Sequence, residues 1–284
     1  MTVVNYFQPT SVPEALALLR EHGPDLVVMA GGTIAMQLIN EGVSQPTSVL
    51  GLRRAGLDTI TPTGDGTRIG ATVTLTTLAG RDDLPLLATT AVRSGSWTIR
   101  NMATVGGNLF TPPPGGDIAV ALLALDARVV IAGMSGEREM ALADFATGYM
   151  TTALETGELV VAVIVPRVAA AARSAFIKLG RRRANTPAVV TVAVAATMEG
   201  DIARDVRIAL GAVAPTPIRA RAAEAIIEGQ VLDEDRIAEA AAAAAAATAP
   251  ATDPIASEWY RRRMAGVVTT RALEQLAGRV PEAA

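Results

Sequence analysis

Hydrophobic positions repeat with helical spacing in some segments of this chain and gather into β-branched runs in others, and the two kinds of segment alternate from end to end. Residues 11–22 (SVPEALALLREH) predict a helix that Ser11 caps, and residues 25–30 (DLVVMA) predict a buried strand. A glycine pair ends this strand, and residues 33–42 (TIAMQLINEG) predict a second helix. The first unit is therefore expected to run helix, strand, glycine turn, helix.

Strand patterns dominate the stretch from residue 46 to residue 80. Residues 63–67 (TGDGT) have the composition of a hairpin turn, and residues 68–75 (RIGATVTL) alternate as a strand does. Residues 128–133 (RVVIAG) and 157–166 (GELVVAVIVP) predict further strands. This part of the chain is expected to be rich in strands, with helices between some of them.

Residues 99–117 (IRNMATVGGNLFTPPPGGD) carry neither pattern. Their glycines and prolines leave little room for regular structure, so we expect a long loop. Compact domains seldom keep such loops without a functional use. Residues 137–149 (EREMALADFATGY), further along, are expected to form a turn and a short helix.

The last third of the chain again combines both patterns. Residues 188–199 (AVVTVAVAATME) form an apolar run, and residues 200–206 (GDIARDV) predict a turn. Residues 233–248 are rich in alanine and predict a helix. Residues 257–278 predict a C-terminal helix, on which Arg261–Arg263 are expected to cover surface or an interface. Unit boundaries are best placed near residue 55 and at residues 167–172.

Composition narrows the classes of protein. The chain has 284 residues, of which 50% are hydrophobic and only 3% aromatic, so its core is expected to be aliphatic. With 25 Lys and Arg against 28 Asp and Glu, the net charge of −3 lacks the basic footprint of a nucleic-acid-binding protein. No apolar stretch reaches the ~20 residues of a membrane span, and no basic segment precedes an apolar one at the N-terminus. We expect a cytoplasmic protein without a membrane span.

The chain has little acid–base or metal chemistry of its own. It contains no cysteine, which excludes disulfides, thiol catalysis and an iron–sulfur cluster held by this chain. Its one histidine, His22, stands beside Gly23 and is expected to be a solvated helix-end residue. We therefore expect no metal site and no catalytic residue here, and any redox or transfer chemistry would belong to a bound group.

Two glycine pairs, at 31–32 and 106–107, are candidates for binding such a group. Backbone N–H groups at turns and helix N-termini bind phosphate, and glycine lets the ligand approach the backbone closely. In the first pair the glycines lie between the predicted strand and helix, and in the second Thr104 and Asn108 add a hydroxyl and an amide. Taken singly, each pair is also compatible with an ordinary turn.

Two charged residues downstream have alternative interpretations. Asp117 opens the predicted helix IAVALLALD, so it could cap that helix or contact a sugar hydroxyl. Lys178 lies in the apolar run AFIKLG, where its charge needs a partner or a pocket mouth.

In their order along the chain, these motifs resemble a known family. They are AGGT (30–33), IRNMATVGGN (99–108), Asp117 with ALLALDARVVI (121–131), GELVVAVIVP (157–166) and FIKLGRRRAN (176–185). The sequence is similar to the FAD-binding medium subunits of the molybdenum hydroxylases, which include carbon monoxide dehydrogenase and xanthine dehydrogenase flavoproteins. The tail VRIALGAVAPTPIRARAAEAIIEG (206–229) resembles their C-terminal domain.

The resemblance implies an α+β fold. Residues 1–55 and 56–167 would be the two subdomains of an FAD-binding domain of the PCMH type, similar to vanillyl-alcohol oxidase. Residues 172–284 would form a small α+β C-terminal domain like that of the carbon monoxide dehydrogenase flavoprotein.

The same resemblance implies the residues that bind FAD. The first loop would comprise Val27, Val28, Met29, Ala30, Gly31, Gly32, Thr33 and Ile34. The second would comprise Thr104, Val105, Gly106, Gly107 and Asn108. Asp117 would lie near the ribityl or diphosphate groups, and Val160 and Lys178 would border the flavin. Many members have Ser or Asp where this chain has Ile34, so one polar contact with the phosphates is expected to be missing.

The resemblance also implies partner subunits, and two alternative functions stay open. The resemblance implies a large subunit with molybdopterin and a small subunit with two 2Fe–2S clusters, assembled as a dimer of heterotrimers, with electrons passing through FAD to an external acceptor. A free-standing FAD-dependent oxidase or dehydrogenase of related fold and a non-catalytic nucleotide-binding scaffold remain alternatives.

Overall fold

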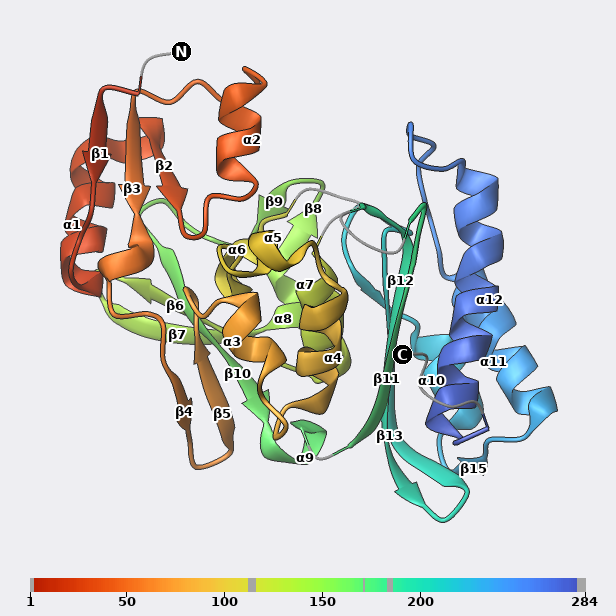
Figure 1. Cartoon of the computed structure of the whole chain (residues 1–284). Helices are drawn as coiled ribbons and strands as arrows, with labels where there is room; N and C mark the ends of the chain where they lie inside the picture. The colour runs from red at the N-terminus through yellow and green to blue at the C-terminus, as the bar shows by residue number, and fades with distance from the viewer. Residues whose placement is uncertain (1–2, 112–115, 171, 183–185, 280–284) are drawn as a thin grey trace.

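Three main sheets succeed one another along the chain, and Figure 1 shows them side by side. The computed structural model describes residues 3–111, 116–170, 172–182 and 186–279. The strands of the three sheets lie within residues 5–51, 60–166 and 173–231. This separation supports the division into 1–55, 56–167 and 172–284, which we keep as a proposal.

The first sheet is small and parallel, with strand order β1-β3-β2. Its strands and helices are β1 (Asn5–Phe7), α1 (Val12–His22), β2 (Leu26–Met29), α2 (Ala35–Asn40) and β3 (Ser48–Gly51), with 3₁₀ turns at Gly23–Asp25 and Leu52–Arg54. The Ser11 hydroxyl accepts from the Glu14 N–H, which confirms the predicted cap of α1. His22 ends α1 and stacks on Phe7, with 4.5 Å between ring centroids.

The second sheet is antiparallel, with strand order β4-β5-β10-β6-β7. The strands are β4 (Ile60–Pro62), β5 (Gly66–Gly70), β6 (Arg128–Gly133), β7 (Gly136–Ala141) and β10 (Leu159–Pro166), and a separate hairpin pairs β8 (Ala146–Gly148) with β9 (Thr151–Thr152). The helices of this unit are α3 (Leu75–Ala79), α4 (Pro85–Arg93), α5 (Trp97–Arg100), α6 (Val105–Leu109), α7 (Asp117–Ala124) and α8 (Leu142–Phe145).

The third sheet is also antiparallel, with strand order β11-β12-β13-β14, and β15 pairs with β13. After the short helix α9 (Arg167–Ala170), its strands are β11 (Arg173–Gly180), β12 (Ala188–Glu199), β13 (Ile202–Gly211), β14 (Ile218–Arg219) and β15 (Gln230–Val231). Helices α10 (Arg221–Ile227), α11 (Glu234–Ala246) and α12 (Glu258–Leu276) cover one face, away from the first two sheets (Figure 1).

Helix α7 joins the second and third units. All eight of its residues are buried, as a helix that is apolar on every side requires. It packs against β12 and β13, and Phe176, Ala193, Ala195 and Ala209 of the third sheet belong to the same apolar cluster as α7. The second and third units therefore share one core at this contact.

Four sequence-based expectations were wrong in detail. The strand expected over 68–75 ends at Gly70. Beyond it, the Val73 carbonyl accepts from the Val105 N–H and the Leu75 N–H donates to the Ala103 carbonyl, so these residues bond to another segment. Thr74 then caps helix α3. The expected loop 99–117 contains α6 and the end of α5, since Thr104 and Ser96 cap these helices; residues 112–115 lie outside the described chain. Residues 136–141 pair with β6 as a strand, although the short helix expected after them is present. The turn expected over 200–206 is shorter, because β13 starts at Ile202.

Arg261 is not a surface residue, contrary to the sequence-based expectation. It is 1% exposed, and its guanidinium donates to the carbonyls of Val189 (2.8 Å) and Ala212 (2.9 Å) and to both carboxylate oxygens of Asp253. Although burial opposes ionisation, hydrogen bonds from Arg261 and from backbone N–H groups lower the pKa of Asp253. Arg261 thus ties α12 to the ends of β12 and β13, whereas Arg262 and Arg263 are exposed as expected.

Across the residues that the structure describes, no helix is both long enough and apolar enough to cross a membrane.

Candidate functional site

A cleft of about 490 Å³ opens between the first sheet and the second unit. This volume lies in the range of cofactor sites. All eight residues predicted for the first loop line it, together with Thr104, Gly106, Gly107 and Asn108 of the second loop and Val160 of β10. Fold topology therefore brings together two glycine segments that are far apart in the sequence.

The first loop lies against the backbone that precedes the second. A side chain at Gly31 would overlap the carbonyl oxygen of Met102, so only glycine permits this close approach. In the described part of the chain, the N–H groups of residues 31–34 donate no hydrogen bond to protein. Four backbone donors at the start of α2 are thus available to an anion in the cleft.

The second loop is held in place by hydrogen bonds to residues that follow β5. The N–H groups of Val105 and Gly106 donate to Val73 and Ala71, and the Gly107 N–H donates to the Thr104 hydroxyl at 3.1 Å. A side chain on Gly106 would meet Ala71, at 2.8 Å from its Cβ and 2.9 Å from its carbonyl oxygen. Glycine at residue 106 is therefore required to fit the loop against Ala71, just after β5, and its role beside a phosphate stays a prediction.

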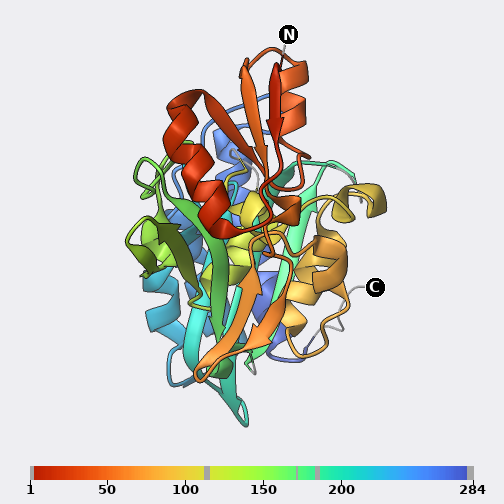
Figure 2. The same ribbon diagram turned by 90° about the vertical axis from the view of Figure 1, so that its left-hand side faces the viewer.

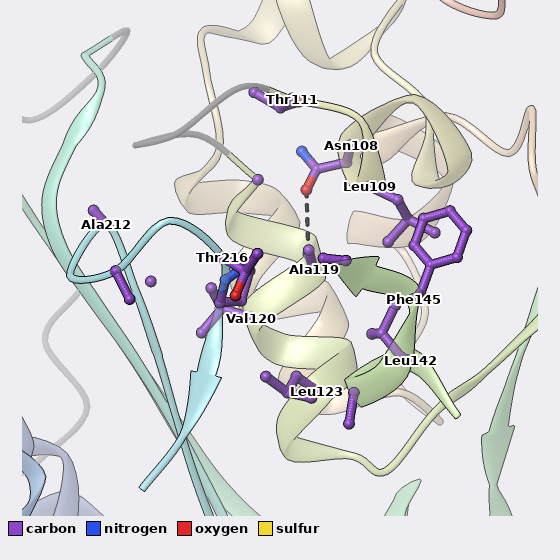
Figure 3. Close-up of a pocket in the computed structure, with 16 residues that line it drawn as sticks. Asn108, Leu109, Thr111, Ala119, Val120, Leu123, Leu142, Phe145, Ala212 and Thr216 are labelled. Carbon is purple, nitrogen blue, oxygen red and sulfur yellow. Dashed lines mark hydrogen bonds between the residues drawn. The ribbon is translucent and has the colours of Figure 1, made fainter. Parts of the chain in front are cut away.

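Asn108 connects the second loop with α7. Its side-chain oxygen accepts from the N–H groups of Ile118 (2.9 Å) and Ala119 (3.2 Å), and thus caps α7 (Figure 3). Asp117 consequently does not cap this helix, which overturns one of its two interpretations. The side-chain nitrogen of Asn108 points away from α7 (Figure 3), and among the described residues it has no hydrogen-bond partner.

Asp117 instead forms a buried ion pair across the contact between the second and third units. The Lys178 Nζ lies 2.6 Å from the Asp117 Oδ2. The Lys178 side chain is 13% exposed and the Asp117 side chain 7% exposed. Burial raises the pKa of the Asp117 carboxyl, and the charge and hydrogen bond of Lys178 offset this only in part. Within the described chain, Asp117 Oδ1 is buried and has no hydrogen-bond partner.

A smaller pocket of about 60 Å³ adjoins the cleft where α7 meets the turn after β13 (Figure 3). Asn108 and Thr111 line both spaces. The wall of the pocket combines aliphatic and aromatic side chains of α7 and α8, such as Val120, Leu123 and Phe145, with Ala212 and Thr216 of the third unit. The cleft thus continues, past Asn108, toward the third unit.

Three predicted site residues do not line the cleft. Val105 is fully buried beneath the second loop, and Asp117 and Lys178 form their own pair beside α7. Sequence reasoning missed Phe110, Met150, Leu154 and Glu158, which do line it. The β8–β9 hairpin brings Met150 there, and the sequence gives no strand signal for that hairpin. No group of three or more potential metal ligands occurs among the described residues.

Comparison with known proteins identifies the family. Residues 2–168 match the model of the "FAD binding domain in molybdopterin dehydrogenase", and residues 175–276 match the "CO dehydrogenase flavoprotein C-terminal domain". The chain belongs to the FAD-binding medium subunits of the molybdopterin dehydrogenases. The predicted family, the α+β fold and FAD as cofactor are thereby confirmed, and the chain is an oxidoreductase component.

Individual medium subunits agree with this assignment over the whole length of the chain. The carbon monoxide dehydrogenase medium chain of Afipia carboxidovorans is 34% identical over 280 residues, covering 97% of each chain. The glyceraldehyde dehydrogenase medium chain of Sulfolobus acidocaldarius is 30% identical, covering 96% of this chain and 98% of its own. The structure of a Cu,Mo-CO dehydrogenase superimposes with a TM-score of 0.93 at 34% identity, over 97% of this chain and 98% of the other.

The described residues of this medium subunit suit FAD. The free N–H groups of residues 31–34 provide donors for a diphosphate, and the unpaired amide of Asn108 adds one from the second loop. The unused oxygen of Asp117 is a buried acceptor beside α7, although Asp117 does not line the cleft.

Proposed function

We propose that this medium subunit passes electrons from the 2Fe–2S clusters of a small partner subunit, through FAD, to an external acceptor. The molybdopterin that oxidises the substrate would belong to a large partner subunit, and the whole would be a dimer of heterotrimers. In support, medium chains of carbon monoxide and glyceraldehyde dehydrogenases match this chain over nearly its full length. The chain itself has no cysteine to hold a cluster.

The residue roles form part of this proposal. The N–H groups of Gly31, Gly32, Thr33 and Ile34 would bind the diphosphate, while Thr104 and Gly106 hold the second loop in place and Asn108 donates its amide. Asp117, Lys178 and Val160 would border the ribityl chain and the flavin. FAD supplies a redox centre that exchanges electrons one or two at a time. The protein binds it, orients it and keeps water from it.

The single observation that carries the proposal is the set of unused donors at residues 31–34. Four adjacent backbone N–H groups without an acceptor, next to a cleft of about 490 Å³, match an extended diphosphate ligand. In an ordinary turn, by contrast, these groups would bond to the protein or face open solvent.

The test uses the native complex, from which flavin is removed with a chaotrope and to which FAD is then returned. We expect one FAD per medium subunit in the native complex. After reduction with dithionite, the clusters should reoxidise rapidly through an external dye only when FAD is present. Equal reoxidation with and without FAD would refute the electron route. Turnover of an organic substrate by the isolated chain would favour a free-standing oxidase, and a native complex without FAD would favour a scaffold.

A further inference from the structure

A short helix on the outer side of the second loop is unusually exposed. Helix α5 (Trp97–Arg100) buries none of its four residues, and Trp97 is 66% exposed. Val92, at the end of α4, and Met102 are also large apolar residues with exposed side chains. Figure 2 shows α5 (gold) projecting from the edge of the molecule. We call the residues Val92, Trp97, Arg100, Met102 and Arg53 the α5 surface.

The α5 surface is held in one conformation. The Arg100 guanidinium donates to the carbonyls of Val92 (3.0 Å) and Gly95 (3.1 Å), and the Ser96 hydroxyl accepts from the Ile99 N–H. Arg53 contacts the sulfur of Met102 at 2.8 Å, which joins the 3₁₀ turn after β3 to this corner. An exposed tryptophan on a well-anchored turn has little conformational entropy to lose on binding, as in the anchor residues of interfaces.

The charge of this region is opposite to that of the whole chain. Residues 51–57 and 92–102 contain four arginines, at 53, 54, 93 and 100, and no Asp or Glu, whereas the chain as a whole has a net charge of −3. A basic and apolar surface of this kind suits a partner that presents acidic groups around an apolar centre. The same charge disfavours binding of this surface to a second copy of the chain, because the arginines of the two copies would repel one another.

The same stretch of backbone reaches the proposed flavin site on its inner side. Ser94 is buried at the end of α4, and α4 packs against α7, the helix that begins at Asp117. At the other end, the carbonyl of Met102 packs on Gly31 of the first loop. A redox partner that sits on the α5 surface would therefore be separated from the site by one layer of chain. Short separation matters because electron transfer slows steeply with distance.

We propose that the α5 surface is the docking site for the iron–sulfur subunit of the complex, which meets it with an acidic and apolar face. The inference rests on the proposed function, because it takes the partner to be the electron donor to FAD. Trp97 would be the central anchor, and the arginines around it would steer and orient the partner. Raising the salt concentration should consequently weaken the contact.

The chain offers a matched control for this proposal. Trp259, on α12, is 68% exposed, against 66% for Trp97, but it lies on the far side of the third sheet. Tagged wild type, Trp97→Ala and Trp259→Ala would be produced together with their native partners and purified. The iron–sulfur subunit would be identified by peptide mass and by acid-labile sulfide, and FAD would be measured in the same samples.

We expect Trp97→Ala to keep one FAD per chain while its affinity for the iron–sulfur subunit falls at least about tenfold. Trp259→Ala should bind that subunit as the wild type does. Equal binding by wild type and Trp97→Ala, with FAD retained, would overturn the docking site and leave the proposed function standing. A wild-type complex without an iron–sulfur subunit would overturn both.

Discussion

The Asp117 carboxylate is the most constrained charged group beside the proposed flavin site. One oxygen bonds to Lys178, while the other has no donor within the described chain. Burial raises its pKa, so the folded state holds a proton more tightly than the unfolded state does. The contribution of Asp117 to folding stability should therefore be most favourable at acid pH, where both states are protonated, and it should fall as the pH rises from the unfolded pKa through the folded one.

Removing Lys178 should magnify this pH dependence. In flavin-free Lys178→Met, the carboxylate loses the cation that it pairs with among the described residues, and we expect a loss of about 3 kcal/mol in the free energy of unfolding at pH 8. The loss should shrink as the pH is lowered toward 4, where the carboxyl becomes protonated. Urea unfolding at several pH values measures this, and the double variant Asp117→Asn/Lys178→Met is the control. A loss that does not change with pH would contradict the buried pair.

Ile34 is the second informative residue. It lines the cleft and starts α2 without a side-chain hydrogen bond to the helix N-terminus. In Ile34→Ser, a hydroxyl would stand beside the free donors of the first loop, and we expect FAD to bind about fivefold more tightly, equivalent to one additional hydrogen bond. Fluorescence titration of apoprotein with FAD measures this. If Ile34→Ser bound FAD no more tightly than the wild type does, the isoleucine side chain would contribute at least as much to FAD affinity as a hydroxyl.

At the scale of elements, the contact between the two loops shapes the cleft. Gly31 is in direct contact with the Met102 carbonyl, and the overlap that a Cβ would create there involves backbone, which cannot rotate away. Gly31→Ala should therefore push the loops apart, weaken FAD binding by at least about tenfold and lower the melting temperature.

The control for the loop contact is Gly64→Ala. Gly64 lies in the turn between β4 and β5, and a Cβ there would meet no atom within 4 Å. It should bind FAD and melt as the wild type does. If Gly31→Ala also behaved as wild type, the close packing of the two loops could not be what positions the donors.

Elements with a regular pattern could be predicted from the sequence, and those fixed by distant contacts could not. The repeating apolar positions and the Ser11 cap were enough to predict α1, and the β-branched run was enough for β10. By contrast, residues 71–75 alternate like a strand, yet backbone bonds to residues 103–105 and the Thr74 cap turn them into a bend and a helix. No local pattern reports such a bond between segments thirty residues apart.

The same limit applies to the site. The glycine motifs predicted which loops meet at the cleft, because strand-to-helix turns expose backbone donors wherever they occur. They could not predict that Gly106 is required by Ala71, that Asn108 caps α7, or that Asp117 pairs with a lysine 61 residues away. Each of these facts depends on how the sheets pack, and side-chain composition alone does not determine that.

At the scale of the whole molecule, the third unit holds α7 by a charged contact at each end. Lys178 of β11 pairs with Asp117 at the start of the helix. Just after its end, Asp126 pairs with Arg207 of β13 and with Arg219 of β14, and Arg219 also bonds to Glu224. The C-terminal unit therefore sets both the position of α7 and, through Lys178, the electrostatics beside the proposed flavin site.

Asp126→Asn tests whether this distal contact governs the proposed site. Asparagine tolerates the positive φ of 48° at this position, so the change removes charge with little backbone strain. Two mostly buried arginines would lose their shared carboxylate, and Arg207 already has nitrogens without an acceptor in the described chain. Because Asp126 is about half exposed, we expect a loss of about 2 kcal/mol in stability, less than for a fully buried pair.

The arrangement of the units predicts how that loss should appear. With the C-terminal unit less firmly docked, calorimetry should resolve two melting transitions where the wild type shows one, and FAD should dissociate faster because Lys178 moves with the third sheet. Asp83→Asn breaks an exposed pair with Arg81, away from this contact, and should change stability by no more than about 0.5 kcal/mol. If Asp126→Asn melted in one step and held FAD as the wild type does, the apolar face of α7 alone would suffice to dock the C-terminal unit.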